Sequence, residues 1–193
     1  MGTVIWDGST DGDWNTAANW DTAAVPVDGD DVIFDGRDNT QDITSVLTTQ
    51  GAVDLASLTI QSSFTKSIGT SDAPLEIEIS GDLLIEGTGS YYIQSGSANA
   101  TTDGAIDRTI INTSGNVYLS SQFNDASNQT VFTDVIVNSG TVVVAGSTEG
   151  QAKATHPTEA GTVIDNLTIA PSNGRGSGVT VTFGEESYRI EGT

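Results

Sequence analysis

Residues 6–36, WDGSTDGDWNTAANWDTAAVPVDGDDVIFDG, gather the side chains of this chain that could do chemistry. All three tryptophans, Trp6, Trp14 and Trp20, lie here with eight aspartates and no lysine or arginine. Aromatic rings could stack on sugars, and aspartates supply the oxygen ligands that calcium prefers. Against both stands a structural interpretation, in which bulky rings close one end of the fold.

A calcium loop is suggested by the run DGSTDGD, which holds Asp7, Asp11 and Asp13. Calcium takes six to eight oxygens, and an EF-hand loop places a bidentate acid at its twelfth position. Counted from Asp7, that position is Ala18, so the EF-hand pattern fails. Asp-Gly turns with solvated carboxylates explain the run more simply. We therefore predict no bound cofactor and no metal site, with calcium at the three aspartates as the alternative.

Catalytic groups are not singled out by the sequence. Glycoside cleavage needs two carboxylates at a defined separation, and none of the 26 acids stands out as one of a pair. His156, the only histidine, lies in the polar loop KATHP, where we expect an exposed residue. There is no cysteine, which excludes disulfides and thiol nucleophiles. We predict no catalytic residues and no enzymatic activity; the alternative in this class is a polysaccharide-active β-helix enzyme.

The charge balance restricts the partners. The formal net charge is −20, from 26 acidic and 6 basic residues. Nucleic acids and anionic membranes bind clustered lysines and arginines, which this chain lacks. We expect neither partner, and the charge suits solubility, cation binding, a basic protein partner or a salty medium.

Short strands dominate the pattern after residue 36. Leu75–Ile79, LEIEI, alternates between aliphatic and acidic residues, and similar runs rich in Val, Ile and Thr recur to Ile190. No segment keeps a helical period, and only 15–24 is helix-tolerant. Apolar residues make up 36% of the chain, which is low for a compact globule but sufficient for a thin stack of coils. We predict a right-handed parallel β-helix, with an antiparallel β-sandwich or jelly roll as the alternative.

A loose repeat supports the stack. The unit is an apolar strand, Ser-Gly and a second strand, centred on Gly81, Gly115, Gly140 and, more weakly, Gly178. Glycine permits the corner that such a coil needs. The polar segments 99–107, 123–129 and 146–161 lack strand signals, and we expect them to bulge from the stack.

One structural domain is predicted, consisting of an N-terminal cap, 1–36, and a solenoid body, 37–193. The end of a β-helix exposes unpaired backbone groups that template aggregation. We expect Trp6, Trp14 and Trp20 to cover that end or to contact a partner there.

The N-terminal segment also resembles a known pattern, W-D-G-x-x-D-G-x-W-x-x-A-x-N-W-x(4)-V-P-x-x-G-D-x-V. It is similar to virion proteins of tailed bacteriophages, and to bacterial β-helical surface proteins and autotransporter-like adhesins. The run VDLASLTIQSSFTKSIGT, which ends at Thr70, also looks like the phage group. The resemblance is good as far as this run, and beyond it only the style of the sequence is shared.

The resemblance to the phage group implies a capsid decoration protein or another virion surface protein. The major capsid protein is then the expected partner, and a homotrimer is the expected assembly. The start MGTVIWDG has neither a basic nor an apolar leader, so we expect synthesis in the host cytoplasm and a place on the virion. The alternative is a glycan-binding adhesin or a receptor-binding module of a tail or fibre.

Overall fold

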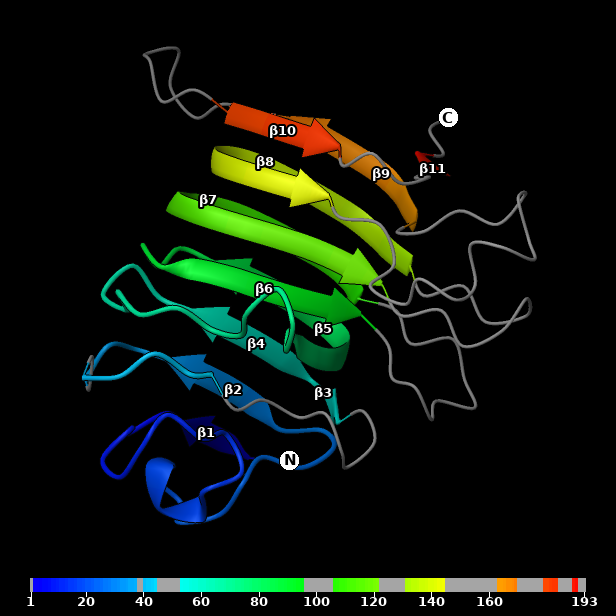
Figure 1. Cartoon of the computed structure of the whole chain (residues 1–193). Coiled ribbons are helices and arrows are strands. Elements are labelled where there is room, and N and C mark those ends of the chain that lie inside the picture. The colour runs from blue at the N-terminus through cyan, green and yellow to red at the C-terminus, as the bar shows by residue number, and fades with distance from the viewer. Residues whose placement is uncertain are drawn as a thin grey trace.

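The computed structural model describes residues 2–37, 40–44, 53–95, 106–121, 131–144, 163–169, 179–183 and 189–190. Within these ranges every pairing between strands is parallel, and the strands stack as successive coils of a β-solenoid (Figure 1). The predicted parallel β-helix is confirmed, and the antiparallel sandwich is excluded.

The elements in chain order are β1 (Thr3–Ile5), the 3-10 helix η1 (Ala17–Asn19), β2 (Asp31–Phe34), β3 (Asp54–Leu55), β4 (Ser57–Ile60), β5 (Leu75–Ile85), β6 (Ser90–Ser95), β7 (Ile106–Ser121), β8 (Val131–Val144), β9 (Val163–Ile169), β10 (Val179–Phe183) and β11 (Arg189–Ile190). The strands predicted on either side of Gly81, Gly115 and Gly140 are continuous, because β5, β7 and β8 each run through such a corner as one strand. The pairing is irregular at the corners, between Ile79 and Asp82 of β5 and between Ile111 and Asn116 of β7.

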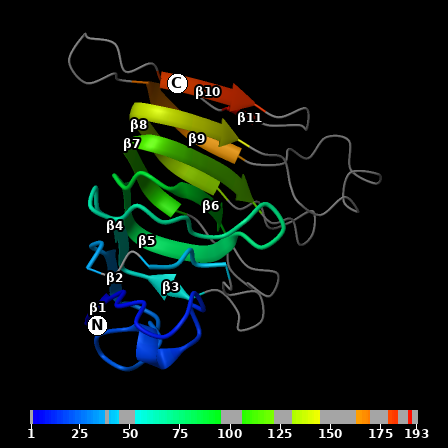
Figure 2. The ribbon, with the colours of Figure 1, turned by 60° about the vertical axis from the view of Figure 1, so that its left-hand side comes forward.

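Three sheet faces surround the core. Face A is built from β1, β2, β4, the end of β5, the first halves of β7 and β8, and β9. Face B contains β3, the middle of β5, the first residues of β7, β8 and β9, and β11. Face C contains β6, the second halves of β7 and β8, and β10. Figure 2 shows the same stack of coils in a view turned by 60° about the vertical axis.

Inward side chains form ladders along the stack. On face A the ladder runs through Val4, Val32, Leu58, Leu83, Thr109, Val135 and Leu167. Each step of this ladder is one coil of the chain, and the steps are nearly equal in length except the last, from Val135 to Leu167. From Val32 to Val135 these side chains are fully buried. Each coil thus buries one row against the next, as repeat architectures require.

Glycines line the corner between faces A and C. A Cβ on Gly115 would lie closer than 3.0 Å to the carbonyl oxygen of Gly89 on the preceding coil, and one on Gly140 would lie 2.9 Å from the carbonyl oxygen of Thr113. Gly81 belongs to another corner, between faces B and A, where its neighbour is the carbonyl oxygen of Ala56. Placing Gly81 in one repeat with Gly115 and Gly140 was therefore wrong, because Ser-Gly marks two different corners. Gly178 lies outside the described residues.

The corner between faces C and B takes up the variation in coil length. Residues 96–105, 122–130, 145–162 and 184–188 each follow a strand of face C and precede a strand of face B. The predicted bulges 123–129 and 146–161, with His156, lie outside the described residues. Of the predicted bulge 99–107, residues 106 and 107 belong to β7. The coils on either side of these insertions still pair in register on face A.

The N-terminal end of the stack is closed by the chain itself. Residues 19–21 run antiparallel along the free side of β1, with a bridge between Trp6 and Trp20. Asp21 N donates to Ile5 O over 3.0 Å, and Asp7 N donates to Asn19 O over 2.7 Å. Figure 1 shows the short helix η1 beneath β1, at the end of the stack. These contacts occupy backbone groups that an unpaired edge would expose.

Candidate functional site: the N-terminal cap and the outer faces

The three tryptophans lie inside the cap. Their exposed fractions are 2% for Trp6, 0% for Trp14 and 2% for Trp20. The ring of Trp20 meets those of Trp6 and Trp14 edge-on, at centroid distances of 5.0 and 4.8 Å. All three pack on Phe34 of the next coil, which in turn contacts Phe64 at 5.1 Å. The rings therefore fill the end of the core, and a stacking surface for a sugar or partner must lie elsewhere.

Asn19 organises the loop that carries these rings. Its side chain is fully buried, and its Oδ1 accepts from Thr10 N at 2.9 Å and Asp11 N at 3.1 Å. Its Nδ2 donates to Asp11 Oδ1 at 2.7 Å and to Asp13 O at 2.8 Å. The amide thus uses both acceptor and both donor positions. This explains why the tight DGD turn before Trp14 holds its shape without regular secondary structure.

Two of the three candidate calcium ligands, Asp11 and Asp13, accept hydrogen bonds within the loop. Asp11 Oδ1 accepts from Asp13 N at 3.0 Å, and Asp13 Oδ1 accepts from Asn15 N at 2.9 Å. The Asp13 amide, and next the Asn19 side chain, lower the pKa of Asp11. In the part of the chain that the structure describes, Asp7, Asp11 and Asp13 form no group that could hold a metal ion, nor do any other three His, Cys, Asp or Glu residues. The absence of a metal site stays a prediction.

The second half of the motif, V-P-x-x-G-D, forms a turn under the first coil. Gly29 has a φ of 80°, a conformation that favours glycine. Asp30, only 8% exposed, accepts from Gly2 N at 2.9 Å and from Val27 N at 3.1 Å. The turn thereby ties the start of the chain to β2. Like Asn19, Asp30 holds backbone segments of the cap together through its side-chain hydrogen bonds.

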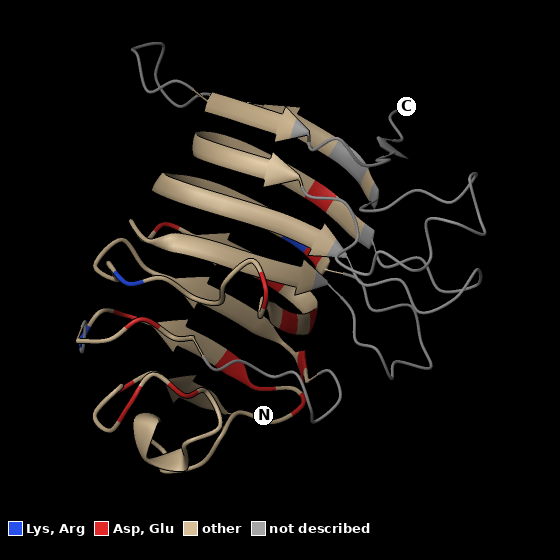
Figure 3. Ribbon diagram, in the orientation of Figure 1, with Lys and Arg blue, Asp and Glu red and all other residues tan. Residues whose placement is uncertain are grey.

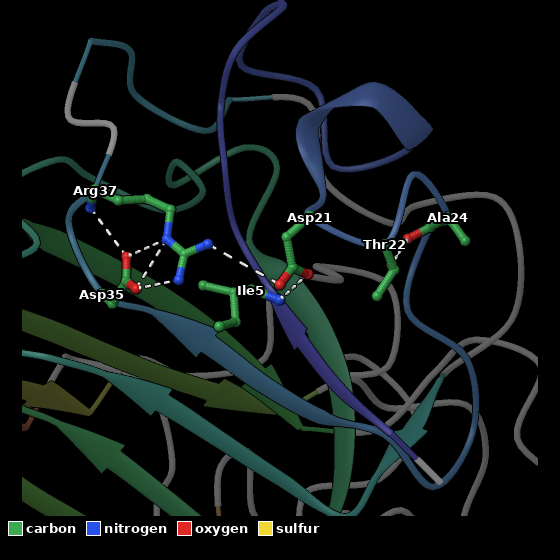
Figure 4. A network of polar contacts seen from close by, with 6 residues as sticks. All are labelled: Ile5, Asp21, Thr22, Ala24, Asp35 and Arg37. Atoms are coloured by element: carbon green, nitrogen blue, oxygen red, sulfur yellow. Dashed lines mark hydrogen bonds and ion pairs between the residues drawn. The ribbon is translucent and has the colours of Figure 1, made fainter.

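One arginine links the cap to the second coil. Arg37 Nη2 lies 2.7 Å from Asp35 Oδ2, and Nη1 lies 4.0 Å from Asp21 Oδ2. Asp21 also accepts from Ile5 N at 2.8 Å. Figure 4 shows the Ile5 side chain between the Asp35–Arg37 pair and Asp21. Hydrogen bonding to Asp35 raises the pKa of Arg37. The guanidinium therefore stays charged, and this one cation bridges two acids beside the outward side chain of Ile5.

Acids accumulate toward the capped end. The first 95 residues carry 16 acidic and 2 basic residues, and the remaining 98 carry 10 and 4. In Figure 3 the acidic segments lie mainly over the lower half of the stack. Three of these acids lie on neighbouring coils: Asp54 N donates to Asp28 Oδ1 at 3.1 Å, and Asp54 pairs with Glu78. Burial, reinforced by Asp54 and Asp28, raises the pKa of Glu78.

The outer side of face C is uncharged along its last coils. Tyr92 and Tyr118 stack there with centroids 4.2 Å apart and planes 2° apart, next to Val143 on the following coil. Ser90, Asn116 and Thr141 form the adjoining outward row. This aromatic pair was not predicted from the sequence, although aligning the chain coil by coil would have placed Tyr92 opposite Tyr118.

Comparison with known proteins leaves the chain without an assigned family. No family model matches it, and no curated protein and no solved structure match it. Within the described ranges, no helix is long and apolar enough to cross a membrane.

Proposed function

We propose that this chain is a non-enzymatic structural protein of a bacteriophage virion, bound to the outer shell of the capsid as a decoration protein. The observation that carries the proposal is the place in the fold of the motif that resembles virion proteins. Trp6, Trp14, Trp20, Asn19 and Asp30 are all buried and close the end of the solenoid. The motif residues therefore close the exposed end of the β-helix. A protein that projects from the shell needs such a closed end.

The proposed partner is the major capsid protein. A net charge of −20 favours association with a basic surface. We propose that copies assemble as homotrimers, because a decoration protein meets the shell at symmetry axes. Mass measurement in solution tests this separately, and a monomer at working concentration would contradict the trimer without affecting the capsid proposal.

Imaging of purified particles tests the function. The expected result is solenoid-shaped density that repeats over the capsid lattice and is absent from particles lacking the gene. Density confined to the tail would move the chain to the alternative, a receptor-binding module. Absence of the chain from washed particles would refute both virion roles.

A second candidate is glycan binding, and Tyr92 with Tyr118 is the observation that favours it. These rings lie on an outer face, whereas the tryptophans do not. A glycan array would test this: a hit that persists in Tyr118→Ala would exclude the tyrosine pair as the platform.

A further inference from the structure

Face A carries an outward ladder of aliphatic side chains. Paired residues along it are Ile5, Ile33, Thr59, Leu84, Ile110, Ile136 and Thr168. From Ile33 to Ile136 their chain neighbours, such as Leu83 and Ile85 beside Leu84, point inward and are fully buried. From Ile5 to Ile136 each ladder residue is only partly buried. Solvated strand faces normally alternate to polar residues, so five large aliphatics in one outward row need an explanation.

The ladder is long. Six steps between adjacent coils, at about 4.8 Å each, give about 29 Å. Outward residues on face C are instead Ser90, Asn116, Thr141 and the tyrosine pair, with Val143 as a single aliphatic residue beside that pair. The aliphatic row is therefore a property of face A and not of outward positions in general.

Acids border the ladder on both sides. Two residues before the ladder position lie Asp31, Asp82 and Asp134 on three of the coils, and two residues after it lie Asp35 and Glu86 on two of them. The other coils carry uncharged residues at several of these positions: Ser57, Gln61, Asn112 and Asn138. In the described coils the one basic residue in these border rows is Arg108, which forms an ion pair with Asp82. A second copy of this chain would bring acid rows against acid rows, so like charge disfavours it as the occupant.

The first step of the ladder shows what chemistry fits. Over Ile5 the protein places its own Arg37, whose guanidinium bridges Asp35 on one side and Asp21 on the other (Figure 4). An aliphatic row whose borders carry more acids than bases is complementary to apolar side chains flanked by lysine or arginine.

We propose that face A is a docking surface for a basic, aliphatic segment of another protein, seated along the row from Ile33 to Ile136. The proposal deepens the function proposed above, because it rests on a shell partner and names the surface and the chemistry of the contact. Arginine and lysine flanks would pair with the border acids, and the aliphatic centre would displace water from the ladder.

The test is selection from a random peptide library on the intact chain. Enriched peptides should combine aliphatic residues with lysine or arginine, and raised salt should weaken their binding. The double variant Ile110→Thr/Ile136→Thr should weaken binding about tenfold. Threonine already stands in this ladder at Thr59 and Thr168, so the fold should persist, which an unchanged melting temperature verifies. Val143→Thr, an outward change on face C, is the matched control and should bind like the wild type.

Other outcomes overturn the proposal. Acidic or charge-indifferent peptides would contradict the complementarity, and equal binding by the double variant would place the contact elsewhere. Self-association of the wild type that the double variant abolishes would make a second copy the occupant. Particle imaging is scored separately: a chain on the capsid with no peptide preference refutes the surface but not the function, and a peptide preference without capsid association refutes the function but not the surface.

Discussion

Removing the side chain of Asn19 should loosen the cap more than any change on its surface. Asn19→Ala deletes four hydrogen bonds, of 2.9, 3.1, 2.7 and 2.8 Å. At about 0.5–1.5 kcal/mol for each bond, the free energy of unfolding should fall by about 2–6 kcal/mol. The matched control is Asn15→Ala, because Asn15 is exposed and its side chain makes a single bond of 3.3 Å, to Asp13. That variant should change stability by less than about 0.5 kcal/mol.

Two probes separate the cap from the body. All three tryptophans lie in the cap, so their fluorescence reports its unfolding, whereas far-ultraviolet circular dichroism reports the stacked strands. In Asn19→Ala the fluorescence transition should move to lower denaturant, ahead of the dichroism transition if the cap opens first. Equal midpoints for Asn19→Ala and Asn15→Ala would refute the role given to Asn19.

Asn19→Asp sharpens the test through pH. The new carboxylate would replace the donor that lies 2.7 Å from Asp11 Oδ1, and two adjacent carboxylates raise each other's pKa. The variant should therefore gain stability as the pH falls from neutral toward the ordinary carboxyl range, and no further below it. The wild type should behave oppositely, because the pKa of Asp11 is lowered in the folded state and its contribution is lost on acidification.

Three further outcomes are expected. Gly115→Ala should cost about 1–3 kcal/mol by pushing the coils apart, whereas Gly2→Ala, whose Cβ would lie 3.7 Å from Asp30 Oδ1, should be neutral in the same melt. Glu78→Gln should raise the melting temperature at neutral pH, because the raised pKa of Glu78 means that its ionised form opposes folding; the gain should vanish below the ordinary glutamate pKa of 4.5, and a constant gain would contradict this. Burial raises the pKa of Tyr91 to about 12, so an ultraviolet titration should show a late phenol that Tyr91→Phe removes, and stability should decline as the pH rises from 10.0 toward that value.

The fold class could be predicted because each coil is locally simple. The alternation in Leu75–Ile79 identifies inward and outward residues before any pairing is known, and the structure buries Leu75, Ile77 and Ile79 accordingly. The register could not be predicted as easily. Ser-Gly occurs at two kinds of corner, so Gly81 was aligned with glycines that occupy another position in the coil.

The candidate site was harder to predict. Tryptophan and aspartate types alone do not reveal whether a side chain is buried, and Asn19, one letter in the motif, makes more hydrogen bonds in the cap than any of the suspected calcium ligands. The outward ladder containing Ile110 and Ile136 depends on pairing between residues that lie a whole coil apart in the chain. Such a surface becomes visible only when the coils are superposed.

The corner between faces C and B, where coil length varies, makes the chain a candidate scaffold for ordered display. A foreign peptide inserted between Ser121 and Val131 would leave the glycine corner and the registers of face A unchanged. Insertions in successive coils would emerge in one column, about 4.8 Å apart. Several weak epitopes held at that spacing could engage a multivalent receptor together, with avidity set by the number of coils used.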